Sequence, residues 1–177
     1  MLSLLQRFIK ARQGLAAVEF ALIAPVMLAL FFGAVELCTA VDCNSRVSRV
    51  GYTVADLVAQ SSAVSTADTT NIFNAANAIL FPFASANAKI VVSSLVDDGK
   101  GGAKVAWSDA QNTAARTKGA TVTIPAGLIT SGSGDSVIFA EITYSFTAPV
   151  TYILGGPITL SNSFYTKPRR STTVAHS

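Results

Sequence analysis

Two residues set five positions apart have the spacing best suited to chemistry in this sequence. Gly14 closes a short leader without acidic residues, and Glu19 follows it inside a long apolar stretch. The leader is basic and carries three cations: Arg7, Lys10 and Arg12. A carboxylate within an apolar membrane helix is costly and usually marks a function. The spacing therefore suggests an arrangement in which the charge of Glu19 is neutralised.

Cleavage of the chain between Gly14 and Leu15 would provide that arrangement. The new α-amine of Leu15 would lie four residues from Glu19, and it can pair with this carboxylate within one chain or between neighbouring chains. Glu19 would also fall in the first turn of the new helix, where the helix dipole favours a negative charge by about 0.3–1 kcal/mol.

The element that must position these residues is an apolar helix long enough to span a membrane. The sixteen residues from Phe20 to Val35 carry no charge. With residues 15–19 added, the helix is about 30 Å long, which matches the apolar core of a bilayer. The basic leader predicts that the N-terminus is cytoplasmic and the rest of the chain lies outside.

Two simpler interpretations leave features of this segment unexplained. A secretory signal peptide fits the leader, but the apolar core holds Pro25, lies between Glu19 and Glu36, and has only a poor cleavage site near Ala40. A lipoprotein site at Cys38 fails because Glu36 stands where a small residue is needed. A single-pass anchor explains the length and the leader but not Glu19.

The block "RQGLAAVEFALIAPVMLALFFGAVEL", residues 12–37, resembles a type IV prepilin signal. It is more closely similar to TadE-like minor pilins (pseudopilins) of Tad/Flp pilus systems. The resemblance covers about forty residues and rests on the cleavage pair Gly14 and Leu15, on Glu19 in "AVEFAL", and on three later positions: Pro25, Gly33 and Glu36. Phe20 stands where major Flp pilins usually have tyrosine.

The resemblance implies a function and a set of partners. A prepilin peptidase would cut after Gly14, and the mature chain would wait in the bacterial inner membrane with its C-terminal domain extracytoplasmic. An inner-membrane assembly platform would then add it to other pilins in a cell-surface pilus that serves adhesion, biofilm formation or surface attachment. Glu19 and Phe20 would contribute to assembly, and helices would pack through residues 15–36, including Pro25, Gly33 and Glu36.

The alternative is an uncleaved, single-pass anchored extracytoplasmic binding or sensor domain unrelated to filaments. Glu36 is otherwise interpreted only as marking the outer edge of the bilayer. Cys38 and Cys43 are too far apart on one helix for an internal disulfide, so we expect reduced packing residues, and an intermolecular bridge stays open.

Enzymatic chemistry finds little support. His176 is expected in a solvated tail, where no catalytic triad can be built around it. "DDGKGG" lacks the spacing of a phosphate loop and reads as a turn. Neither a metal site nor a cofactor is expected. Without residues 1–14, ten basic and ten acidic side chains remain; the only basic cluster is the short 167–170 run, so no nucleic-acid partner is expected.

The remaining sequence predicts an α+β, pilin-like fold with four regions: leader 1–14, transmembrane helix 15–36, helix continuation 37–60 and globular domain 61–177. Only 13% of the residues are charged, which suits an extracytoplasmic β-rich domain. The continuation should bury a stripe from Val47 to Val58 and end near Gln60, and its charged residues can face water: Asp42, Arg46, Arg49 and Asp56.

A second, short helix is expected at 67–80, capped by Thr66 or Asp68. Antiparallel strands are expected at 89–96, 103–110, 120–124, 136–149 and 158–167. The aromatic residues expected in the sheet core are Trp107, Phe139, Tyr144, Phe146, Phe164 and Tyr165.

Overall fold

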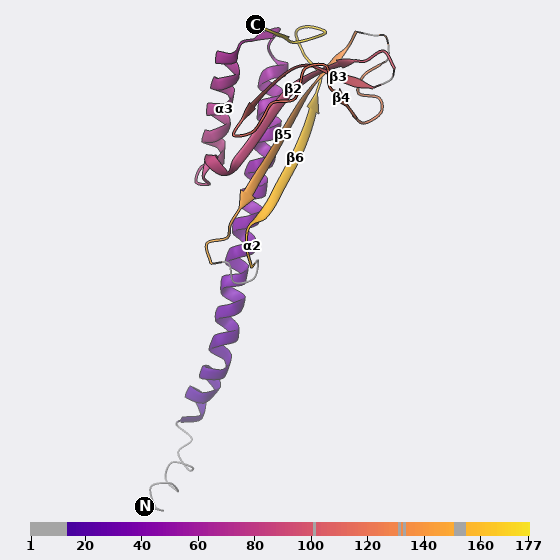
Figure 1. Ribbon diagram of the computed structural model, residues 1–177. Coiled ribbons are helices and arrows are strands. Elements are labelled where there is room, and N and C mark those ends of the chain that lie inside the picture. The colour runs from indigo at the N-terminus through magenta and orange to yellow at the C-terminus, as the bar shows by residue number, and fades with distance from the viewer. Residues whose placement is uncertain (1–13, 101, 131, 133, 151–154) are drawn as a thin grey trace, which may run out of the picture.

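The computed structural model describes residues 14–177 apart from 101, 131, 133 and 151–154. The leader cations Arg7, Lys10 and Arg12 lie outside the described residues. One long helix, α2 (Leu15–Ala59), has its C-terminal half beside a sheet, while its N-terminal half projects away from the domain (Figure 1). The predicted α+β class, with long helix, short helix and C-terminal antiparallel sheet, is confirmed.

The second helix, α3 (Thr66–Leu80), begins one residue earlier than expected and packs on α2. Its N-cap is Ser65, so the expected caps Thr66 and Asp68 were wrong. Ser65 Oγ accepts from the backbone N–H of Asp68 (3.2 Å), and Asp68 Oδ2 accepts from the backbone N–H of Ser65 (2.9 Å). This reciprocal capping box satisfies two backbone donors, and its hydrogen bonds lower the pKa of Asp68.

The C-terminal half of the chain forms an antiparallel sheet of order β4-β3-β2-β5-β6 within the described residues. Its strands are β2 (Ala88–Asp97), β3 (Ala103–Gln111), β4 (Thr121–Val122), β5 (Ser136–Phe146) and β6 (Ile158–Thr166), with the short 3-10 helix η2 (Ser85–Asn87) before β2. Each expected strand is present. The expected 136–149 strand is shorter and ends at Phe146, because its partner β6 begins at Ile158, the residue that pairs with Phe146.

The core lies between α2, α3 and one face of the sheet. Residues 43, 47, 50, 54 and 58 of α2 are fully buried, as the helical rhythm from Val47 to Val58 predicts. At Gly51 a Cβ would lie only 2.6 Å from Phe164 Cδ2, so glycine lets β6 approach the helix closely. A smaller cluster covers the other face of the sheet around Leu95 and Phe139. The aromatic residues expected in the core are buried or partly buried.

Two of the charged residues of α2, both partly exposed, also connect parts of the domain. Arg46 donates from Nε to Asp42 (3.0 Å) and from Nη1 to the carbonyl of Phe81 (2.6 Å), tying α2 to the end of α3. Asp56 pairs with Arg169 (2.5 Å), which follows β6. These side chains connect elements that lie far apart in the chain, so periodicity within one element does not predict the contacts.

Residues 175–176 form a short parallel pairing that the sequence did not predict. Strand β7 (Ala175–His176) pairs with β1 (Ala63–Val64) between α2 and α3. Val174 is buried, and its carbonyl accepts from Trp107 Nε1 (2.7 Å). The expectation of a solvated tail at His176 was therefore wrong.

Candidate functional site

The first candidate site is the start of α2. Gly14 is the N-cap, with φ −85° and ψ −14°, and Leu15 is the first helical residue. Gly14 is exposed and nothing lies within 4 Å of the position of an added Cβ, while Leu15 is 61% exposed. The described side of this peptide bond is therefore open to another protein.

Glu19 is exposed on α2, but it lies just beyond the first turn, which contains no acidic residue. The expected place in the first turn was therefore wrong. Because the dipole effect fades within that turn, an amine partner becomes the stronger explanation for this carboxylate. After Glu19, the next cation along the chain is Arg46. An α-amine at Leu15 would be four residues away, which is one helical turn.

The N-terminal half of α2 offers a long apolar surface that its own domain does not cover. The helix contains an 18-residue apolar stretch of which no part is buried, and it is long and apolar enough to cross a membrane. Its large exposed side chains include Phe20, Leu22, Ile23, Val26, Met27, Leu28, Leu30 and Phe31. Pro25 is exposed within it, and the helix continues through it. A helix surface that is apolar on all sides must be covered by lipid or by other helices.

The domain first covers the helix at Gly33 and Glu36, which are both buried. They lie one helical turn apart and therefore share a side of α2. Glu36 is fully shielded from solvent, so its carboxylate faces neither water nor lipid. Of the three later positions in the resemblance, only Pro25 is exposed to a neighbouring helix.

The two cysteines differ in environment. Cys38 is exposed, Cys43 is buried, and both are free. The helix runs unbroken between them, which keeps them unpaired within one chain. Burial and, to a smaller extent, the neighbouring Asp42 carboxylate raise the pKa of Cys43 to about 11. The positive charge of Arg46 opposes this rise only in part. Its thiol therefore stays protonated at neutral pH.

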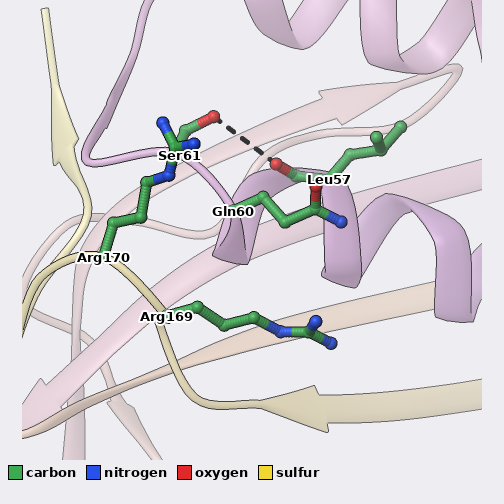
Figure 2. Close-up of a pocket in the computed structure, with 5 residues that line it drawn as sticks. All are labelled: Leu57, Gln60, Ser61, Arg169 and Arg170. Carbon is green, nitrogen blue, oxygen red and sulfur yellow. Dashed lines mark hydrogen bonds between the residues drawn. The ribbon is translucent and has the colours of Figure 1, made fainter.

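A polar pocket at the far end of α2 is lined by Leu57, Gln60, Ser61, Arg169 and Arg170 (Figure 2). Ser61 Oγ donates to the carbonyl of Leu57 (3.5 Å). The Arg169 backbone N–H donates to the carbonyl of Ala59 (2.9 Å), so this segment closes the end of the helix. The charges of two members of the 167–170 cluster are paired, Lys167 with Asp135 (3.8 Å) and Arg169 with Asp56.

A second pocket, beside the edge of β3, contains the group nearest to a catalytic arrangement. His176 Nε2 lies 2.8 Å from Asp109 Oδ2, and its ring lies 5.1 Å from that of Trp107. Ser108 does not complete a triad, because adjacent strand residues face opposite sides. Its hydroxyl instead contacts Ser93 Oγ (2.9 Å) and accepts from the backbone N–H of Arg116 (3.1 Å). The contacts of His176 with Asp109 and Trp107 hold the C-terminal strand β7 against β3.

In the described part of the chain, no group of three or more His, Cys, Asp or Glu side chains lies together. The His176–Asp109 pairing is a polar feature that the sequence did not predict. The two residues lie 67 positions apart, and linear spacing gives no sign that they meet in space.

Comparison with known protein families gives a match at the N-terminal segment. Residues 14–56 match the family described as TadE-like protein. The match begins at Gly14, includes Glu19 and Glu36, and ends inside α2, so it leaves most of the domain outside it. Neither the search of curated proteins nor that of solved structures gives a match. The resemblance seen in residues 12–37 is confirmed, and it associates the chain with Tad pilus systems.

Proposed function

We propose, from the TadE-like segment at residues 14–56, that this chain is a minor pilin of a Tad-type pilus. A prepilin peptidase removes the leader after Gly14. The mature subunit is held in the bacterial inner membrane by α2, with its domain on the extracytoplasmic side. It then takes part in pilus assembly with other pilins and the inner-membrane assembly platform.

The structural observation that supports this proposal beside the TadE-like segment is the uncovered apolar half of α2. A monomer in water would expose the large side chains of that half at high cost, since burial of each is worth about 1.5–3 kcal/mol. A bilayer supplies the missing cover before assembly, and neighbouring helices supply it in a filament. The same surface can therefore pass from lipid to protein without ever meeting water.

Glu19 has a defined part in that transfer. In the mature chain its carboxylate pairs with the Leu15 α-amine of its own or a neighbouring subunit. An unpaired carboxylate would be costly in an apolar bundle, so the pairing favours a register in which amine and acid meet. Phe20, which is 72% exposed beside it, contributes apolar contact at the same level.

The globular domain acts in adhesion or surface attachment rather than in catalysis. The His176–Asp109 pair lacks an aligned nucleophile, and its contacts hold β7 to the sheet. We propose no cofactor and no nucleic-acid partner.

The decisive test is the N-terminus of the protein made in its native host. Intact-mass and N-terminal analysis should find a chain that starts at Leu15. A host strain without active prepilin peptidase should yield the chain with its leader as the matched control. Retention of Met1 in cells with active peptidase would contradict the pilin proposal and favour an uncleaved anchored domain.

A further inference from the structure

The polar pocket at the far end of α2 has a volume of about 680 Å³. Two segments far apart in the chain form it: Leu57, Gln60 and Ser61 come from the end of the helix, and Arg169 and Arg170 follow β6. In Figure 1 this end of α2 lies near the C-terminus, at the opposite end of the molecule from the apolar half. With α2 anchored in a membrane, the pocket therefore lies at the end of the domain farthest from the bilayer.

The end of α2 does not need the two guanidinium groups as caps. A helix C-terminus leaves four carbonyls without partners inside the helix. Here the carbonyls of residues 56–59 accept from the backbone N–H groups of Gln60 (3.0 Å), Ser61 (3.1 Å) and Arg169 (2.9 Å) and from the Ser61 hydroxyl (3.5 Å). All four carbonyls are thus satisfied without an arginine side chain.

The side chain of Arg169 is held in place by Asp56. Arg169 Nη2 donates to Asp56 Oδ1 (2.5 Å), and Gln60 Nε2 donates to Asp56 Oδ2 (2.5 Å). One carboxylate therefore neutralises Arg169 and orients the amide of Gln60. Among the described residues, no hydrogen bond ends on Gln60 Oε1, so this oxygen stays available as an acceptor.

The cation of the pocket that lacks a partner is Arg170. Its guanidinium makes no hydrogen bond or ion pair with any residue that the structure describes. Figure 2 shows the Arg170 side chain extending toward Ser61, while Arg169 extends below Gln60. Two arginines and the single carboxylate of Asp56 leave one net positive charge, which an anionic group can neutralise.

The donors and acceptors around Arg170 indicate the class of ligand. A guanidinium fork binds a carboxylate through two parallel hydrogen bonds. Beside it, Gln60 Oε1 is an acceptor, and the Ser61 oxygen keeps its lone pairs because its proton is donated to the Leu57 carbonyl. These two oxygens suit hydroxyl donors. A sugar acid carries a carboxylate and hydroxyls on one ring, whereas an acidic side chain of a peptide brings the carboxylate without such hydroxyls.

We propose that this pocket binds a uronic acid unit of an acidic polysaccharide, with its carboxylate on Arg170 and its hydroxyls on Gln60 and Ser61. Arg169 is a positioning residue, since it shares Asp56 with Gln60. As a means of attachment, this site rests on the adhesion role within the proposed function and gives that role a ligand. Binding itself depends on the folded domain and not on leader cleavage or pilus assembly.

Calorimetric titration of the full-length chain in a nonionic polyoxyethylene detergent tests the site. The ligand is trigalacturonate, and neutral galactotriose is its matched control. A triglutamate peptide with blocked ends represents the acidic-peptide alternative. Arg170→Gln removes the unpaired guanidinium, and Arg49→Gln is the matched control variant, because Arg49 is also exposed and lies on α2 away from the pocket. Thermal unfolding checks that both variants keep their fold.

Trigalacturonate should bind the unmodified chain at least about tenfold more tightly than galactotriose does. Arg170→Gln should weaken this binding about tenfold or more, because hydrogen bonds between charged groups are the strong ones. Arg49→Gln should change it less than about twofold, since salt screens a distant exposed charge. Equal weakening by the two variants would show unspecific attraction to positive charge and overturn the proposal. Absence of trigalacturonate binding, or tighter binding of the peptide, would overturn it equally.

Failure of this site is distinguishable from failure of the pilin proposal, because the titration uses uncleaved chain. A host protein that starts at Leu15 but binds no trigalacturonate would keep the pilin proposal and remove the sugar site. A host protein that retains Met1 and loses trigalacturonate binding with Arg170→Gln would do the reverse.

Discussion

The two halves of α2 are both rich in apolar residues, yet they have opposite surroundings. Residues 15–32 are exposed or only partly buried, with no member of that run in the core. From Cys43 to Ala59 the apolar residues form a buried stripe against α3 and the sheet. What separates the halves is the placement of charge: the second carries Arg46, Arg49 and Asp56 beside its stripe, while the first carries only Glu19. Amphipathicity thus identifies a helix that packs on its own domain, and its absence identifies one that needs lipid or partners.

The largest expected effect comes from the same substitution made in each half. Val50→Asp places a carboxylate at a fully buried site, which costs several kcal/mol and should unfold the domain. Val26→Asp, at a site that is 59% exposed, should leave the domain's unfolding unchanged. It should instead weaken membrane insertion by about 2.5–3.5 kcal/mol. Thermal unfolding in detergent and membrane fractionation measure the two effects separately.

This pair of substitutions can also break the comparison. If Val26→Asp lowered the unfolding temperature of the domain as much as Val50→Asp, the exposed half would be part of the folding unit. If Val50→Asp left the domain folded, the buried stripe would not hold the helix to the sheet.

The next effect concerns Glu19, the charge that distinguishes the apolar half from a plain anchor. Glu19→Ala should leave insertion intact but reduce pilus assembly about tenfold or more, since a hydrogen bond to a charged group contributes about 1.5–3 kcal/mol. Asp42→Ala is the matched control, because that carboxylate lies on the same helix in an exposed pair with Arg46, which is worth little. Quantification of sheared surface pili, with membrane fractions probed for the subunit, gives both readouts. Normal assembly of the Glu19→Ala subunit would argue against the proposed pairing.

Sequence alone gave most of the fold because its signals are local. The stripe from Val47 to Val58 and the alternation in β5 follow from period, and the β2–β3 turn from "DDGKGG". In that turn, Asp98 Oδ1 accepts from the backbone N–H of Lys100 (2.7 Å) and of Gly102 (2.9 Å), and these bonds lower the pKa of Asp98. Neighbouring residues make such contacts, so pattern finds them.

The features that sequence did not give depend on residues far apart in the chain. Trp107 meets Val174, and Asp109 meets His176, across sixty-seven positions. Glu36 is shielded only because the folded domain covers that side of α2, and no periodicity in residues 15–36 distinguishes it from an exposed charge. The candidate assembly site, in contrast, lies in one continuous stretch, and that is why a sequence resemblance could place Gly14, Glu19 and Pro25.

The smallest effect sharpens the boundary between the two halves, because Cys38 and Cys43 stand on either side of it. In folded protein in detergent at mildly alkaline pH, a thiol reagent should modify Cys38 and spare Cys43, and denaturation should make the thiol of Cys43 reactive.

The pKa of Cys43 is raised from 9.0 to about 11. Between these values the folded state binds more protons than the unfolded state, so the free energy of unfolding should fall as the pH rises through this window. Below pH 9 this thiol should contribute no pH dependence. Unfolding measured across the window should show a weaker fall for Cys43→Ala, while Cys38→Ala should behave as the unmodified chain. Equal reactivity of both thiols in the folded chain would move the boundary of the packed half beyond Cys43.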